Sequence, residues 1–127
     1  MTSTDFDRLV ARAFAAIPSH FRRRMQNVAL VVEPEPPPVP GGRTLLGLYQ
    51  GRPLTKRSVF EGFAMPDRIT IFQGPHERLA QSPQHLEKLV EETVWHEVAH
   101  YFGMDERQVR AAEDRRRRRA GRRRANS

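Results

Sequence analysis

Two histidines and a glutamate form a five-residue pattern, His96-Glu97-Val98-Ala99-His100. On a helix of about 3.6 residues per turn, side chains four positions apart differ by about 40° in direction, so both imidazoles can bind one metal ion. The Glu97 carboxylate lies about 100° from His96, where it can contact a metal-bound water without binding the metal. Zinc lowers the pKa of such a water to about 7, and Glu97 would take its proton as the water attacks a carbonyl. We therefore predict a hydrolytic Zn²⁺ site with His96 and His100 as ligands and Glu97 as catalytic base.

A catalytic zinc ion usually has three protein ligands and one open position. After His100, Gly103 permits a sharp turn that brings the chain back toward the metal. The metzincin spacing places the third ligand six residues after the second histidine, which is Glu106 in this sequence. Asp105 beside it is the alternative ligand. Either acid also suits the first turn of a following helix, where a carboxylate complements the helix dipole.

The two histidines could instead be structural side chains of a buried helix face. Trp95, Val98 and Phe102 in the same stretch are typical of such a face. Two histidines beside a glutamate are costly inside a core unless a metal binds them. The metal site is therefore the favoured interpretation.

The histidines fall in the longest periodic segment of the chain. Ser82 and Pro83 form a typical N-cap and first-turn pair, and we predict a helix from Pro83 to Phe102 that ends at a left-handed Gly103. Apolar residues at helical intervals predict another helix over residues 5–17, and Pro18 can open a short one after it. We also predict a C-terminal helix over about residues 105–118.

Three apolar segments in the first part of the chain predict strands. Residues 28–32 are a β-branched run, residues 45–49 form a second candidate, and residues 67–72 alternate with a period of two. The proline-rich residues 33–42 form a stiff loop between the first two strands. Helix, strands and helix in this order predict an α+β fold with a small sheet.

The charge of the chain is concentrated at one end. The chain has 127 residues, 38% apolar and 29% charged, with a net charge of +7. Residues 115–127 hold eight of the 22 basic side chains and no acid, so residues 1–114 carry 14 basic and 15 acidic side chains, a net charge of −1. We predict one domain over residues 1–114 and a disordered, Arg-rich tail over residues 115–127.

The arginines of the tail suit nonspecific binding to nucleic-acid phosphates, which would weaken steeply with salt. The alternative is a solvated terminus without a partner. The tail has no aromatic residues, so base stacking is not indicated. The arginines are Arg115, Arg116, Arg117, Arg118, Arg119, Arg122, Arg123 and Arg124.

The composition excludes several classes of protein. The chain has no cysteine, which excludes disulfides, thiol catalysis and cysteine-bound zinc. No apolar run is long enough to span a membrane, and the first residues lack the pattern of a signal peptide. We expect a cytoplasmic monomer without membrane contact.

Several motifs in a fixed order resemble the bacterial minimal zincins, a zincin-like metallopeptidase family with a shortened core. The histidine motif extends to the HExxHxxGxx[D/E] pattern over residues 96–106. The matching stretches are residues 27–33, 46–54, 57–58, 66–75 and 96–106. Together they extend over most of residues 5–113, so the resemblance is more specific than the zinc motif alone.

The resemblance implies a zincin-like α+β fold with a three- to four-stranded sheet, an N-terminal helix, a long active-site helix and a C-terminal helix. It also implies Zn²⁺ on His96 and His100, Glu97 as base and an acidic third ligand at the position of Glu106. The family usually has aspartate there, so Glu106 is one methylene longer.

Zincins bind an extended peptide along an edge strand beside the cleft. By analogy this strand is Asp67, Arg68, Ile69, Thr70, Ile71 and Phe72, and the alternative is that the same residues form a central strand. The oxyanion donor is left open among Tyr49, Tyr101, His20, His76 and Arg57. Two functions therefore compete: a zinc-dependent peptidase, and a zinc-binding module without turnover that binds nucleic acid or protein through the tail.

Overall fold

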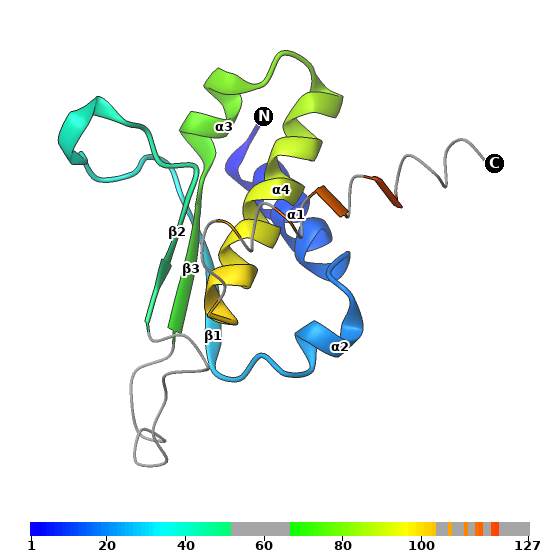
Figure 1. Ribbon diagram of the computed structural model, residues 1–127. Helices are drawn as coiled ribbons and strands as arrows, with labels where there is room; N and C mark the ends of the chain where they lie inside the picture. The colour runs from blue at the N-terminus through cyan, green and yellow to red at the C-terminus, as the bar shows by residue number, and fades with distance from the viewer. Residues whose placement is uncertain (52–66, 104–106, 108–110, 112–113, 116–117, 120–127) are drawn as a thin grey trace.

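The computed structural model describes residues 1–51, 67–103, 107, 111, 114–115 and 118–119 of the chain. Figure 1 shows an α+β arrangement in which α4 packs on one face of a small sheet and α1 packs against α4. This confirms the predicted fold class. The elements are α1 (Ser3–Ala15), α2 (Ser19–Arg22), β1 (Val28–Glu33), a 3₁₀ turn η1 (Pro40–Gly42), β2 (Gly47–Gln50), β3 (Asp67–Phe72), α3 (Gln73–Leu79) and α4 (Pro83–Tyr101).

The strand β3 lies in the middle of the sheet that the described residues form. The strand order is β1-β3-β2, with β1 parallel and β2 antiparallel to β3. Val28 is opposite Asp67, and Gly47 is opposite Ile71. The expectation that residues 67–72 form an edge strand is therefore wrong, and the central alternative holds. Both backbone edges of β3 are paired with neighbouring strands, so β3 cannot add a peptide strand.

The burial of β3 agrees with its central place. Every residue of the strand except Arg68 is buried, and Ile69 and Ile71 have no exposed surface. Arg68 instead reaches Glu33 of β1 at 3.0 Å. The residues of β1, which we expected to form a buried strand, are all only partly buried, because among the described strands β1 has a neighbour on one side only.

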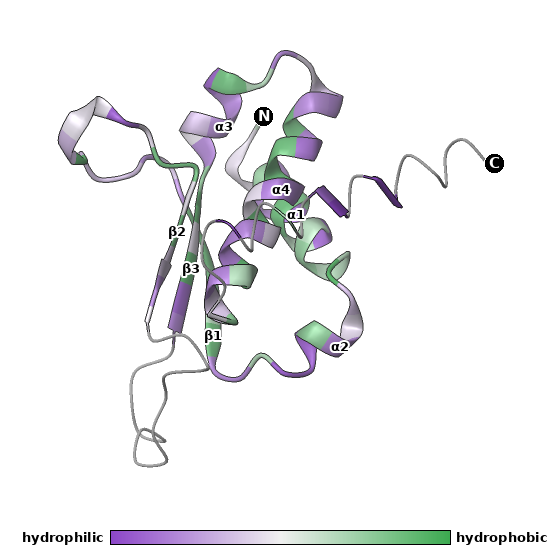
Figure 2. Cartoon of the chain, in the orientation of Figure 1, coloured by the Kyte–Doolittle hydropathy of each residue, from purple (hydrophilic) through white to green (hydrophobic). Residues whose placement is uncertain are grey.

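The core lies between α1, α4 and the sheet. Phe6, Leu9 and Val10 of α1 are buried in one cluster with Val90, Val94 and Val98 of α4 and with the two isoleucines of β3. Green and purple positions alternate along α4 in Figure 2 because one side of this helix packs in the core and the other faces away from it. The core therefore fixes the rotation of α4, and with it the direction of its histidines.

Both ends of α4 agree with the sequence. Ser82 Oγ accepts a hydrogen bond from the His85 backbone N–H at 3.0 Å, and Pro83 occupies the first turn. Gly103 has a φ of 79° after the last turn, a left-handed conformation that glycine adopts without strain. The helix runs from Pro83 to Tyr101, one residue shorter than predicted.

The short helix α3 was not expected, because Gly74 and Pro75 are typical of the end of a strand. Pro75 lies in the first turn of α3, where its missing N–H breaks no helical hydrogen bond. The proline-rich segment after β1 is tied to this helix: the Gly74 N–H donates to the Pro34 carbonyl at 2.8 Å. Arg78 also donates to both carboxylate oxygens of Glu35, at 2.6 and 2.8 Å.

The described residues after Gly103 have helical backbone and are exposed, at positions 107, 111, 114, 115, 118 and 119. The remaining arginines of the predicted tail, and the segment 104–106, lie outside the described residues. Among the helices of the described part of the chain, none is both long and apolar enough to cross a bilayer.

Candidate metal centre

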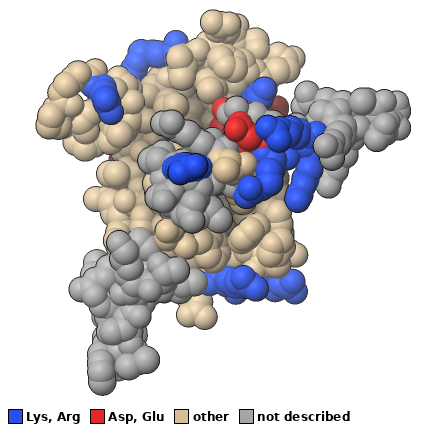
Figure 3. Space-filling model, in the orientation of Figure 1, with Lys and Arg blue, Asp and Glu red and all other residues tan. Residues whose placement is uncertain are grey.

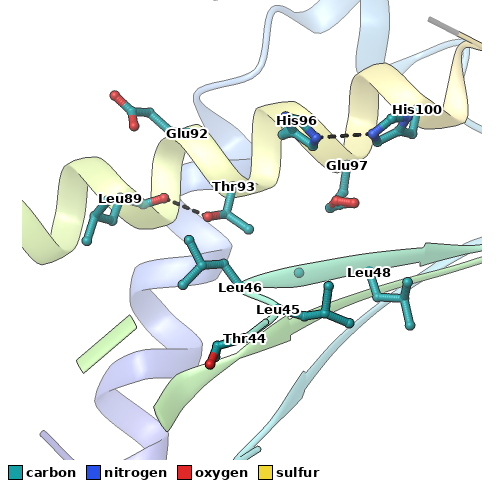
Figure 4. Close-up of a pocket in the computed structure, with 11 residues that line it drawn as sticks. Thr44, Leu45, Leu46, Leu48, Leu89, Glu92, Thr93, His96, Glu97 and His100 are labelled. Atoms are coloured by element: carbon teal, nitrogen blue, oxygen red, sulfur yellow. Dashed lines mark hydrogen bonds between the residues drawn. The ribbon is translucent and has the colours of Figure 1, made fainter. Parts of the chain in front are cut away.

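His96 and His100 lie one turn apart on α4, as the spacing predicts, and their rings face each other. The two Nε2 atoms are 3.1 Å apart, and the ring planes meet at 72°. Both side chains are partly exposed, whereas Val98 and Ala99 between them are buried. Figure 4 shows the pair side by side along the helix.

The separation of these nitrogens fits zinc. A tetrahedral ion bound about 2.0–2.1 Å from two imidazoles holds their nitrogens about 3.3 Å apart, close to the 3.1 Å observed. In the described residues no group of three or more potential ligands comes together. Asp105 and Glu106, the predicted third ligands, lie outside the described residues.

Glu97 is on the same stretch of helix but points toward the sheet (Figure 4). Its side chain is 6% exposed and packs beside the start of β2. A Cβ at Gly47 would lie 3.1 Å from Glu97 Cγ and 2.7 Å from Thr93 Cγ2. Because only a glycine fits at this distance, Gly47 allows β2 to lie directly against α4.

A cavity of about 470 Å³ opens between α4 and the chain that enters β2. The three residues of the motif line it together with Thr93 and Leu89, which precede them on the same helix. The other wall is the segment from Thr44 to Leu48. The complete lining is Thr44, Leu45, Leu46, Gly47, Leu48, Leu89, Glu92, Thr93, His96, Glu97 and His100. The volume is in the range typical of small-molecule and peptide subsites.

Sequence reasoning missed the residues of this second wall. The strand beside the cavity is β2, which pairs with β3 on one side and, within the described residues, with no other strand. One signal in the sequence was available: a glycine inside a strand pattern, Gly47, often marks a close approach of backbones. The helix residues Leu89 and Thr93 were indistinguishable from other positions of a periodic helix.

Of the predicted oxyanion donors that the structure describes, none lines the cavity. Tyr49 donates to the Asp67 carboxylate at 2.7 Å, and the Tyr101 hydroxyl accepts from the Gln26 N–H at 3.0 Å. His20 lies against the ring of Phe21. Arg57 lies outside the described residues.

The fifth candidate, His76, lies behind the site with no exposed surface. Its Nδ1 donates to the Phe72 carbonyl at 2.7 Å, and its Nε2 is 2.9 Å from the hydroxyl of Thr93. Burial lowers the pKa of His76 below its ordinary value of 6.5. His76 therefore contacts the wall of the cavity from the core side and does not reach the cavity itself.

The sequence from residue 25 to residue 116 matches the family model described as zincin-like metallopeptidase. The chain belongs to this family. This zincin-like metallopeptidase is also similar to a solved structure, a conserved hypothetical protein from Thermus thermophilus, with 32% identity and a TM-score of 0.58. The similarity covers 80% of this chain and 94% of the other. No curated protein gives a significant match.

The family match confirms the resemblance to the minimal zincins. It also includes the histidine motif, because residues 96–100 lie inside the matched range. For this zincin-like metallopeptidase, zinc is the metal that the family typically binds. The arginines from Arg117 onward lie beyond the matched residues.

Proposed function

We propose that this zincin-like metallopeptidase is a zinc-dependent peptidase whose catalytic residues are His96, Glu97 and His100. The observation that carries the proposal is the pair of facing Nε2 atoms, 3.1 Å apart, with the Glu97 carboxylate beside them on the wall of a cavity. A pair of metal ligands, a buried carboxylate and a space for substrate are parts that zinc-dependent amide hydrolysis requires.

His96 and His100 hold the metal in this proposal, and Glu106 or Asp105 supplies the third ligand. A bound zinc ion supplies Lewis-acid polarisation of the water and of the scissile carbonyl. The partly exposed imidazoles leave room for substrate on the cavity side, as a catalytic site with an open position requires.

Glu97 moves the proton. Its carboxylate accepts a proton from the attacking water on one oxygen and delivers it to the nitrogen of the leaving amine. The side chain is packed between α4 and Gly47 and is only 6% exposed. This packing holds the carboxylate in one place, so that little freedom is lost when the substrate binds.

The strand β2 is the part of the sheet that can bind a peptide backbone. It lies next to the cavity, and within the described residues its second edge is not paired with another strand. An extended peptide can add to such an edge through main-chain hydrogen bonds, with its side chains alternating toward and away from α4. In this proposal β2 has the role that the sequence assigned to residues 67–72.

The decisive experiment combines metal analysis with cleavage of a peptide library. We expect about one zinc ion per chain and cleavage that a chelator abolishes and added zinc restores. Glu97→Gln should keep the zinc and lower the rate by about 10²–10⁴. Glu87→Gln is the matched control, because Glu87 is an exposed residue of the same helix, and it should cleave like the wild type.

Two results would contradict the peptidase proposal. One is the absence of zinc from protein purified without chelator. The other is undiminished cleavage by Glu97→Gln. A protein that keeps zinc but cleaves no member of the library would support the second function, a zinc-binding module without turnover.

The tail supports a separate activity that does not depend on catalysis. Arg115, Arg118 and Arg119 are exposed on helical backbone, and Figure 3 shows several blue side chains gathered together on one side of the molecule. We propose that the arginines of the tail bind nucleic-acid phosphates without sequence preference, by releasing counterions.

A further inference from the structure

The side of α4 that faces β2 carries three residues spaced one turn apart, Thr93, Glu97 and Tyr101. Side chains four positions apart lie on one face of a helix, and Figure 4 shows Thr93 and Glu97 pointing to the same side. All three residues are buried. On β2 they are met by Gly47 and Tyr49, which the alternation of a strand places on one side. Glu97 therefore has a buried neighbour one turn before it and another one turn after it.

Tyr101, the neighbour after Glu97, is held by two other parts of the chain. It has no exposed surface. Its hydroxyl accepts a hydrogen bond at 3.0 Å from the backbone N–H of Gln26, in the segment between α2 and β1. Its ring meets the ring of Tyr49 edge to face, with the centroids 6.2 Å apart and the planes at 87°. These two contacts fix the last turn of α4.

Tyr49 is in turn held by the central strand. Its hydroxyl donates to the Asp67 carboxylate at 2.7 Å, and a hydrogen bond of this length to a carboxylate is among the stronger ones. Asp67 is buried at the start of β3, and its N–H donates to the Asn27 carbonyl at 3.0 Å. A continuous set of contacts thus joins the start of β3 to the end of α4 through the two tyrosines.

The turn that Tyr101 fixes also carries His100. The His100 carbonyl accepts from the Gly103 N–H at 2.9 Å where the helix ends, and the predicted third ligands follow at positions 105 and 106. A metal site keeps its geometry only if each ligand is held to within about 0.5 Å. A shift of this turn would therefore move the imidazole of His100 away from the metal position.

We propose that Tyr101 is a positioning residue of the metal centre. Held by Gln26 and Tyr49, it sets the direction of the His100 imidazole and of the Glu97 carboxylate. Tyr101 touches neither the metal nor the substrate and acts through the backbone of α4. This inference rests on the proposed zinc-dependent function.

The first test measures zinc affinity and needs no turnover. Tyr101→Phe keeps the ring against Tyr49 and removes the acceptor of the Gln26 N–H, whereas Tyr101→Leu removes both contacts. We expect the Kd for zinc, measured by competition with a chelating dye, to rise about tenfold in Tyr101→Phe and further in Tyr101→Leu. The visible absorption of the Co²⁺-loaded protein should shift as well, because it depends on the arrangement of the ligands around the ion.

The control separates positioning from a general loss of stability. Val10→Ala removes two methyl groups from a buried residue of α1 in the core. It should make the zinc-free protein easier to unfold in urea, as Tyr101→Phe does. The zinc Kd of the folded Val10→Ala protein should nevertheless equal that of the wild type.

The second test follows peptide cleavage at saturating zinc. Tyr101→Phe should lower kcat about tenfold and leave KM unchanged, because it displaces Glu97 and not the peptide on β2. Val10→Ala should keep both constants.

The outcomes distinguish this role from the peptidase itself. Wild-type zinc affinity and an unchanged Co²⁺ spectrum in Tyr101→Phe would overturn the positioning role, whatever the activity. An equal loss of zinc affinity in Val10→Ala would also overturn it, because the effect would then follow from stability alone. A wild-type protein that binds zinc and cleaves no peptide would contradict the peptidase only, and a loss of zinc affinity confined to the Tyr101 variants would still support the positioning of His100.

Discussion

At the scale of single residues, His76 connects the core to α4 through Thr93. A carbonyl oxygen only accepts, so Nδ1 carries the proton that binds the Phe72 carbonyl. The Thr93 hydroxyl lies 2.9 Å from both His76 Nε2 and the Leu89 carbonyl. One hydroxyl proton cannot serve two acceptors, so a second proton on the imidazole would complete this set of hydrogen bonds. Burial disfavours the positive charge that this second proton would bring. Burial is therefore the largest effect on the pKa of His76, and it lowers that pKa.

We predict that His76 makes the folded protein less stable as the pH falls below 7. Its pKa in the folded protein lies below the ordinary 6.5, so below about pH 6.5 the unfolded chain binds the extra proton first. The free energy of unfolding should therefore be highest above pH 7 and should fall as the pH drops from 7 toward 5. Urea unfolding at several pH values should show a flatter dependence for His76→Gln. Parallel curves for the two proteins would contradict this role.

At the scale of elements, the site exists because β2 lies against α4. The cavity has one wall on each of them, and Gly47 is the point of closest approach. The sheet holds β2 in place through its pairing with β3, where Gly47 is opposite Ile71 and the Phe72 N–H donates to the Leu46 carbonyl at 3.0 Å. The geometry of the candidate site thus depends on a contact between segments far apart in the chain.

We predict that Gly47→Ala separates these two elements. The added Cβ would meet Thr93 Cγ2 at 2.7 Å, and overpacking of this kind costs about 1–3 kcal/mol of stability. Cleavage should fall as well, because Glu97 Cγ is only 3.1 Å from the same position. Both effects are measurable by urea unfolding and by peptide hydrolysis.

A second substitution serves as the control for Gly47→Ala. Thr93→Ser removes the Cγ2 atom that the new Cβ would meet and keeps the hydroxyl beside His76. The double variant should therefore regain part of the stability, with a coupling energy of about 0.5–3 kcal/mol. Strictly additive effects of the two substitutions would show that the contact does not limit the approach of β2.

At the scale of the whole molecule, the concentrated positive charge and the histidine motif lie in different parts of the sequence. Residues 1–114 have a net charge of −1 and contain the histidine motif, whereas residues 115–127 carry eight arginines. The helical residues at positions 115, 118 and 119 are exposed. Loss of the tail should therefore change electrostatic binding without changing the core.

We predict that removal of residues 115–127 abolishes the salt-dependent affinity for nucleic acid and leaves peptide cleavage intact. Each phosphate contact that is lost lowers the salt slope by about 0.7–0.9. Affinity for single- and double-stranded DNA, measured for the full and the shortened chain between low and physiological salt, tests this. Equal affinity of the two chains would refute a role of the tail in binding.

Much of the fold and part of the site could be predicted from the sequence, because they depend on neighbours along the chain. The Ser82 cap, the glycine stop at Gly103 and the apolar period of α4 are local signals. The facing of His96 and His100 follows from helical geometry alone. By contrast, α3 escaped prediction because Gly74 and Pro75 are equally typical of a turn, and only the contact with Pro34 and Glu35 favours the helix.

By itself the sequence therefore predicted the helix face that carries the two histidines, Glu97 beside them as the catalytic base, and the class of fold, of which the structure confirms the class of fold. Only the tertiary structure decided that residues 67–72 form the central strand and that β2 lies beside the cavity. It also decided that Leu46 and Leu89 line the same cavity as Glu97. The physical reason is that the alternation of apolar and polar residues along a strand indicates which of its faces is buried. It does not indicate which strands lie next to it, because those depend on hydrogen bonding to segments distant in the sequence. The approach of β2 to α4 likewise joins distant segments, because Gly47 and Thr93 lie 46 residues apart in the sequence.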